Sequence, residues 1–146
     1  MLFRAFLPIL ALLALAACET TPPAAPPQPP VQPRDEPPAH VVFFDKGSIQ
    51  INPTGIATIK QAAVEAKKPG VKSVDVTGHT DRSGSDRVNN ALSLRRARLV
   101  RDRLIREGVP AALITARGLG ESKPFMQTED GVGQPENRRV EILITR

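Results

Sequence analysis

Proline dominates the stretch between Glu19 and Pro38, and this stretch decides which part of the chain can fold into a core. It reads ETTPPAAPPQPPVQPRDEPP and has almost no large apolar side chains. Such a sequence favours polyproline II, an extended helix without internal hydrogen bonds, which would reach about 60 Å over twenty residues. A PxxP stretch can also be a ligand for SH3-like domains, but we interpret this one as a disordered spacer. A packed domain is therefore expected only in residues 39–146.

The N-terminus has the pattern of a secretory signal. One positive residue, Arg4, precedes a run of about 12 apolar residues, which is too short to span a bilayer. The run ends in Leu15-Ala16-Ala17-Cys18, which looks like a bacterial lipobox. That resemblance implies removal of residues 1–17 and attachment of lipid to the Cys18 thiol, with residues 18–38 as the linker. The alternative is an ordinary signal peptide with a chance cysteine.

A lipid at Cys18 would anchor the chain to a membrane of the bacterial envelope. Some bacteria retain lipoproteins in the inner membrane when an acidic residue, chiefly aspartate, follows the lipidated cysteine. Glu19 matches that rule less well than aspartate would. We therefore expect an outer-membrane location, with the domain facing the periplasm.

Composition narrows the classes of partner and cofactor. Cys18 is the only cysteine, so no internal disulfide can form, and neither Trp nor Tyr is present to stack on nucleic-acid bases. With two histidines and this one cysteine, we expect no metal cluster and no cofactor. The formal net charge is +5, with arginines clustered between Arg95 and Arg106. We expect no nucleic-acid partner, and instead attraction to an anionic polymer or membrane surface.

Apolar periodicity in the domain predicts the order β-α-β-α-β-β. Strands are indicated at residues 40–44, 71–78, 114–118 and 140–144. Helices are indicated at residues 53–66, after Asn52 as N-cap, and at about 86–107, closed by Gly108. Residues 121–136 lack periodicity and should form a loop. Because helical crossovers normally join parallel neighbours, the expected fold class is a two-layer α/β (α+β) domain with a mixed four-stranded sheet.

One arginine of the second helix lies on the face that should be buried. With Leu92 as the origin and about 100° per residue, Arg96 falls inside the apolar arc, whereas Arg95 and Arg98 fall outside it. A buried guanidinium is tolerated only when partners satisfy it. We expect Arg96 either to pair with an internal carboxylate or to await an anionic ligand. Asp81, at the end of the preceding strand, is the nearest candidate partner.

Five segments, VFFDKGSIQI, VDVTGHTDRSG, NNALSLRRARLV, GLGESKP and NRRVEI, are spread over the whole domain. Together they resemble the OmpA C-terminal-like family, which includes the peptidoglycan-associated lipoproteins. The resemblance implies non-covalent binding of peptidoglycan through the diaminopimelate of its stem peptide. By motif, it also implies a set of ligand-binding residues, with the first two as walls: Phe44, Asp45, Thr80, Asp81, Asn89, Arg96 and Arg138.

The chemistry of diaminopimelate agrees with this assignment, because the ligand presents an ammonium and a carboxylate on one carbon. Asp81 can hold the ammonium, while the planar fork of Arg96 can take the carboxylate in a bidentate pair. Before ligand binds, we expect these two side chains to bond to each other or to water. The sequence departs from the family pattern at Val88, where an aromatic residue is common, and after Gly133, where an arginine is common.

The resemblance implies a lipoprotein that tethers a membrane to the cell wall, and not an enzyme. His79, Asp81, Ser83 and Ser93 superficially supply the parts of a hydrolase triad, but no nucleophile elbow such as GxSxG is present. A murein hydrolase is therefore the weaker alternative. The stronger alternative is a module that binds envelope proteins in a secretion, motor or division complex.

Overall fold

The computed structural model describes residues 40–146, so Cys18, the expected signal segment and the expected spacer lie outside the described residues. The main elements follow in the order β1 (His40–Phe43), α1 (Pro53–Ala66), β2 (Ser73–Gly78), α2 (Asp86–Arg106), β3 (Ile114–Gly118) and β4 (Arg139–Thr145). Two short 3-10 helices, Ala111–Leu113 and Pro135–Asn137, precede β3 and β4. The predicted β-α-β-α-β-β order is confirmed.

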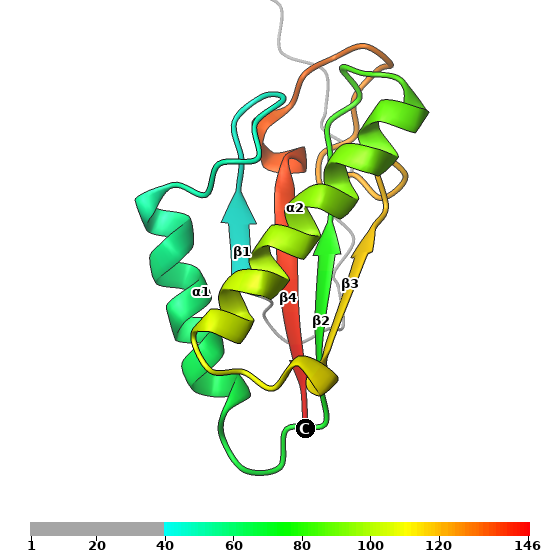
Figure 1. Ribbon diagram of the computed structural model, residues 1–146. Coiled ribbons are helices and arrows are strands. Elements are labelled where there is room, and N and C mark those ends of the chain that lie inside the picture. The colour runs from blue at the N-terminus through cyan, green and yellow to red at the C-terminus, as the bar shows by residue number, and fades with distance from the viewer. Residues whose placement is uncertain (1–39) are drawn as a thin grey trace, which may run out of the picture. The chain divides into compact units, whose positions relative to one another are not determined.

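The four strands form one mixed sheet in the order β1-β4-β2-β3, which confirms the predicted architecture. Strand β4 is antiparallel to both β1 and β2, whereas β2 and β3 are parallel. Helix α2 therefore joins two parallel neighbours, as expected for a helical crossover. Helix α1 instead joins two strands that β4 separates (Figure 1).

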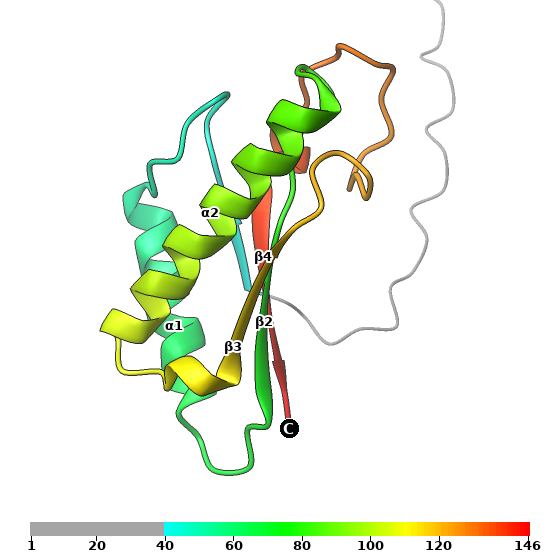
Figure 2. The ribbon, with the colours of Figure 1, turned by 45° about the vertical axis from the view of Figure 1, so that its right-hand side comes forward.

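Both helices cover the same face of the sheet, so the domain has two layers (Figures 1 and 2). Helix α1 packs on β1 and β4, and α2 packs on β2 and β3. The core between the layers is almost entirely aliphatic, and its larger buried members are Val42, Phe44, Ile59, Val74, Val76, Val100, Leu104, Val140 and Ile142. Within residues 40–146, no helix combines the length and the hydropathy needed to cross a bilayer.

The ends of the elements differ from the sequence prediction by one or two residues. Strand β1 ends at Phe43, and β2 begins at Ser73 rather than at Val71. Phe44 has left the strand but stays buried, and its backbone N–H donates to the Arg138 carbonyl at 2.9 Å. The expected loop is irregular except for the 3-10 turn that begins at Pro135.

The C-terminal ends of β2 and β3 approach the backbone of α2 so closely that only glycine fits. A Cβ on Gly78 would lie 2.1 Å from the Ser93 carbonyl oxygen, and one on Gly118 would lie 2.4 Å from the Leu94 nitrogen. Carbon atoms do not approach backbone atoms at these distances, so the two glycines fix α2 against the sheet. This contact also fixes Arg96, which lies almost one turn further along the helix.

We expect Gly78→Ala to lower the free energy of unfolding by at least about 2 kcal/mol, because the new methyl group would collide with the Ser93 carbonyl. Urea unfolding followed by circular dichroism measures the loss. The control is Val64→Ala, since Val64 is 60% exposed and its truncation should change stability by less than about 0.5 kcal/mol. Equal stability of Gly78→Ala and wild type would contradict the close contact.

Candidate functional site

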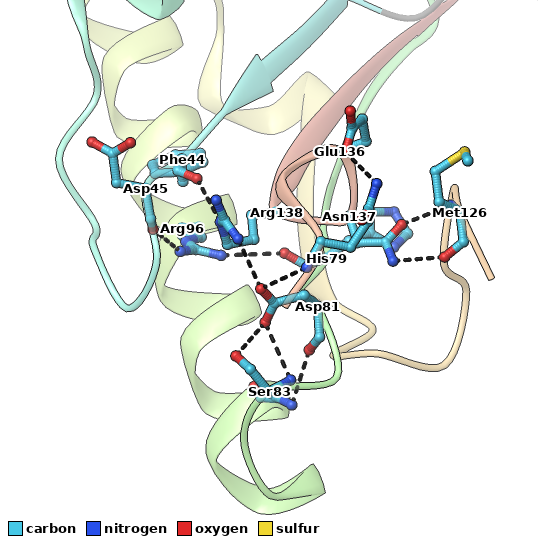
Figure 3. A network of polar contacts seen from close by, with 12 residues as sticks. Phe44, Asp45, His79, Asp81, Ser83, Arg96, Met126, Glu136, Asn137 and Arg138 are labelled. Carbon is cyan, nitrogen blue, oxygen red and sulfur yellow. Dashed lines mark hydrogen bonds and ion pairs between the residues drawn. The ribbon is translucent and has the colours of Figure 1, made fainter. Parts of the chain in front are cut away.

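Three segments meet at one end of the sheet, beside the N-terminal half of α2 (Figure 3). They are residues 44–48 after β1, residues 79–83 after β2, and residues 134–138 before β4. Hydrogen bonds between them converge on Asp81, Arg96 and Arg138. The structure therefore brings together three of the four charged candidate residues, and the fourth, Asp45, contributes through its backbone carbonyl.

Asp81 accepts hydrogen bonds on both carboxylate oxygens. Its Oδ2 accepts from Arg138 Nη1 at 2.9 Å and from the backbone N–H of Gln134 at 3.3 Å. Its Oδ1 accepts from the Ser83 hydroxyl at 2.7 Å. Burial alone would raise the pKa of Asp81, but the hydrogen bonds from Ser83 and Arg138 outweigh it and hold the pKa below the ordinary 3.8. This buried carboxylate is therefore charged at neutral pH.

Arg96 is fully buried, in agreement with its position on the helix, and its partners are backbone carbonyls. Its Nε donates to the Ser48 carbonyl at 2.9 Å, and its Nη2 donates to the Asp45 carbonyl at 2.9 Å. A longer bond of 3.4 Å joins Nη1 to the His79 carbonyl. The Phe44 ring lies over the guanidinium, 4.9 Å from ring centroid to Cζ. One side chain thus ties two loops to α2.

Of the alternatives expected for Asp81 and Arg96, a direct bond between the two side chains is not found: Arg96 donates to backbone carbonyls instead. Arg138, which lies 57 residues after Asp81 in the chain, is the residue that pairs with this carboxylate. Burial lowers the pKa of Arg96 to about 10, with the charge of Arg138 adding to the shift and that of Asp81 opposing it. With a pKa of about 10, Arg96 remains charged at neutral pH. By formal charge, two arginines and one aspartate make the cluster net positive.

Arg138 connects the loops on either side of it. Its Nε donates to the Phe44 carbonyl at 3.2 Å, in addition to the bond from Nη1 to Asp81. Its side chain is 14% exposed. Nη2 has no hydrogen-bond partner among residues 40–146, so the side chain keeps an unused donor at the edge of the cluster.

Asn89 and Thr80 are both buried beside the cluster. The Asn89 amide donates to the Asp81 backbone carbonyl at 3.2 Å and to Glu121 Oε2 at 2.5 Å, so it holds the loop in place. The Thr80 hydroxyl is buried and has no partner in the described part of the chain. A buried hydroxyl without a partner costs free energy, and a ligand or an ordered water can satisfy it.

Phe44 and Asp45 contribute in different ways. The Phe44 ring covers the Arg96 guanidinium, and its backbone carbonyl accepts from Arg138. Asp45 is exposed and gives only its backbone carbonyl to Arg96, while its carboxylate points away from the guanidinium (Figure 3). Asp45 therefore acts on the cluster through its main chain.

Three contributors were not identified from the sequence: the Ser83 hydroxyl, the Gln134 backbone N–H and the Ser48 carbonyl. Backbone groups carry no residue-type signal, so no sequence pattern could indicate the last two. Ser83 could have been found, because it lies two residues after Asp81 in a turn. That spacing favours hydrogen bonds between the side chain of one residue and its neighbours.

In the candidate triad, both serine hydroxyls donate to groups other than the histidine. The Ser83 hydroxyl donates to Asp81, and the Ser93 hydroxyl donates to the Asn90 carbonyl at 2.9 Å. His79 Nε2 lies 3.8 Å from Glu141 Oε2. Over residues 40–146, no three side chains of His, Cys, Asp or Glu are grouped so that they could hold a metal ion.

A separate cavity of about 370 Å³ lies next to the loop that carries Asp81. Arg82 and Asp86 line it together with residues between 119 and 127, whereas the charged cluster does not. Arg82 forms ion pairs with Glu121 at 3.5 Å and with Asp130 at 3.1 Å. These contacts join residues 121–130 to the loop after β2 and so support the site from outside.

Comparison with known proteins agrees with the fold and the motifs. The model of the OmpA family matches residues 43–138, which include every candidate ligand-binding residue. The chain is 36% identical to the probable lipoprotein YiaD of Escherichia coli over 104 residues, which make up 71% of this chain and 48% of YiaD. It is 34% identical to the outer-membrane lipoprotein YfiB of Pseudomonas aeruginosa over 145 residues, covering 90% of this chain and 86% of YfiB. The chain thus spans about half the length of YiaD.

Solved structures of related proteins have the same fold. The peptidoglycan-associated lipoprotein of Burkholderia pseudomallei superposes with a TM-score of 0.66 at 31% identity, over 73% of this chain and 90% of that one. The C-terminal domain of Helicobacter pylori MotB shares the fold, with a TM-score of 0.64 at 24% identity over 73% of this chain and 84% of that one. The chain belongs to the OmpA family.

Proposed function

We propose that this chain is an outer-membrane lipoprotein whose domain binds peptidoglycan non-covalently through the diaminopimelate of the stem peptide. The observation that carries this proposal is the buried cluster of two arginines and one aspartate at one end of the sheet. Its net positive charge complements a carboxylate, and Asp81 complements an ammonium. Membership of the OmpA family and the similarity to a protein named peptidoglycan-associated lipoprotein support the ligand class.

In this proposal, each charge of the ligand replaces or joins a contact within the cluster. The ammonium of diaminopimelate binds the Asp81 carboxylate, and the neighbouring carboxylate binds the unused Nη2 of Arg138. Arg96 uses three of its five N–H groups on carbonyls, which leaves one on each terminal nitrogen for the same carboxylate. Because Asp81 and Arg138 are already paired at 2.9 Å, neither is left as an isolated buried charge before binding.

Arg96 takes part only after a local movement. The Phe44 ring covers its guanidinium, which has no exposed surface. The ligand carboxylate therefore meets Arg138 first and reaches Arg96 when the ring or residues 45–48 shift. This order gives Arg138 the role of the outer contact and Arg96 the role of the inner one.

In this proposal, the N-terminal part of the chain attaches the domain to the membrane. Lipid on Cys18 anchors the chain in the outer membrane, and residues 19–38 span the gap between the membrane and the wall. The domain has no catalytic role. The alternatives are a module that binds envelope proteins and a murein hydrolase. If either were correct, free diaminopimelate would have no effect on wall binding.

Free diaminopimelate should release the wild-type domain from purified sacculi. Calorimetry with free diaminopimelate should show at least about 30-fold weaker binding for Asp81→Ala, because loss of one partner of a buried charge pair costs about 2–5 kcal/mol. The control is Arg95→Ala, on the exposed side of α2 next to Arg96, which should bind the free ligand normally. If diaminopimelate does not release the domain from sacculi, the proposal is contradicted.

Arg96→Lys should weaken diaminopimelate binding by at least about 10-fold, because a single ammonium cannot replace the planar fork. It should also lower the free energy of unfolding by about 2 kcal/mol, since the carbonyls of Asp45, Ser48 and His79 lose the donors of the guanidinium. Faster hydrogen exchange at Ser48, whose N–H donates to the Asp45 carbonyl at 3.1 Å, would report the loosened loop. If Arg95→Lys behaves identically in both assays, the role given to Arg96 is wrong.

Cys18→Ser should yield a chain without acyl groups that is either soluble in the periplasm or incompletely processed. Mass spectrometry of the mature protein from membranes measures the acyl mass directly. A mature wild-type chain that carries no acyl groups on Cys18 would exclude the lipid anchor.

A further inference from the structure

The net charge of helix α2 equals the net positive charge of the whole chain. Its 21 residues include seven arginines and two aspartates, a net charge of +5, and the whole chain also has a formal net charge of +5. The other charged residues of the chain therefore balance one another. The excess charge is concentrated on one helix.

Three of the seven arginines already have partners. Arg96 is buried in the site, Arg101 bonds to Asp102 at 2.8 Å, and Arg103 bonds to Glu107 at 2.9 Å. The remaining four are exposed and have no ion pair or hydrogen bond with any residue between 40 and 146: Arg87, Arg95, Arg98 and Arg106. We call these four residues the arginine stripe.

The arginine stripe occupies one side of the helix. At about 100° per residue, its four members fall within an arc of about 100°, away from the face that packs on the sheet. It extends from Arg87 in the first turn to Arg106 in the last, a length of about 28 Å at 1.5 Å per residue. Helix α2 lies in the outer layer of the domain and runs from the end that holds the site to the opposite end (Figure 1).

The helix dipole favours Arg106, which lies in the last turn, but helix stability does not account for the other three members of the stripe. Arg95 and Arg98 are three residues apart on the same side, a spacing at which like charges repel. Arg87 lies in the first turn, where the helix dipole disfavours a positive charge. Each effect costs a few tenths of a kcal/mol.

We infer that the arginine stripe is a second contact surface for peptidoglycan, which binds carboxylates of the peptide stems next to the one held in the site. This inference rests on the proposed function. Asn89, in the first turns of α2, contacts the Asp81 loop from the buried side of the helix, and Arg87 lies on the exposed side at the same end of α2. A polymer that extends beyond the single stem held at the site can therefore pass the N-terminal end of α2 and continue along the stripe.

The charge of the polymer complements the stripe over its whole length. Peptide stems repeat along a glycan strand and carry free carboxylates, so several can face exposed guanidinium groups at once. Each exposed contact contributes only about 0.2–1 kcal/mol. Their sum matters because the polymer is already held at the site, which raises the local concentration of neighbouring stems.

The test compares two double variants that remove the same charge. Arg95→Gln with Arg98→Gln removes the centre of the stripe, and Lys60→Gln with Lys72→Gln removes two exposed lysines outside α2. Binding to purified sacculi is measured at about 50 mM and about 300 mM NaCl, where surface charges are screened weakly and strongly. We expect the arginine variant to bind about 5-fold more weakly at low salt and like wild type at high salt. The lysine variant should match wild type at both.

Two further readouts separate this inference from the proposed function. Free diaminopimelate should bind the arginine variant and wild type equally, because the small ligand does not reach the stripe. If wild type fails to bind free diaminopimelate, the proposed function fails, whatever the salt dependence. The stripe is excluded if both double variants bind sacculi alike, or if the arginine variant loses only its binding to vesicles of anionic phospholipid.

Discussion

The burial of the Arg96 guanidinium is the interaction on which the geometry of the site depends. Removing such a charge from water costs several kcal/mol unless hydrogen bonds replace its hydration. Here the replacements are carbonyls of Asp45, Ser48 and His79, which belong to two different loops. The loops after β1 and β2 are therefore held by the same side chain. Because Gly78 allows the backbone of α2 to rest directly on β2, the position of this side chain is set by the sheet and not by the loops.

The pair of Asp81 and Arg138 would allow the proposed site for a zwitterion to be stable without its ligand. Each supplies the counter-charge of the other at 2.9 Å, so the domain does not depend on the ligand to compensate a buried charge. The remaining imbalance is the second guanidinium, that of Arg96, whose pKa burial lowers to about 10. A ligand carboxylate corrects this imbalance, whereas a lone cation would increase it. The cluster thus favours ligands in which an anionic group accompanies the ammonium.

The sequence was sufficient to predict the order of the elements and the fold class. Apolar periods indicate each helix and strand without reference to its neighbours, and Asn52 and Gly108 mark helix ends. It also placed Arg96 in the interior, since a helix face follows from spacing alone. It did not indicate the partner of Asp81. Arg138 reaches that carboxylate because β4 lies between β1 and β2, and strand order cannot be read from the periodicity of single strands. The sequence also could not identify which carbonyls accept from Arg96, because every residue has a carbonyl.

Helix α2 can serve two kinds of contact because its sides face different environments. The buried side carries Arg96, whose bonds are protected from water and so depend on geometry. The exposed side carries the arginine stripe, whose interactions are long-ranged, weak and screened by salt. Buried polar contacts discriminate between ligands, whereas exposed charges mainly accelerate association with a polymer of opposite sign. Because Gly78 and Gly118 hold α2 against the sheet at Ser93 and Leu94, both sides of the helix keep a constant position relative to the sheet. In the proposed function, attraction along the stripe would therefore act together with recognition of a single zwitterion at the end of the domain where α2 begins.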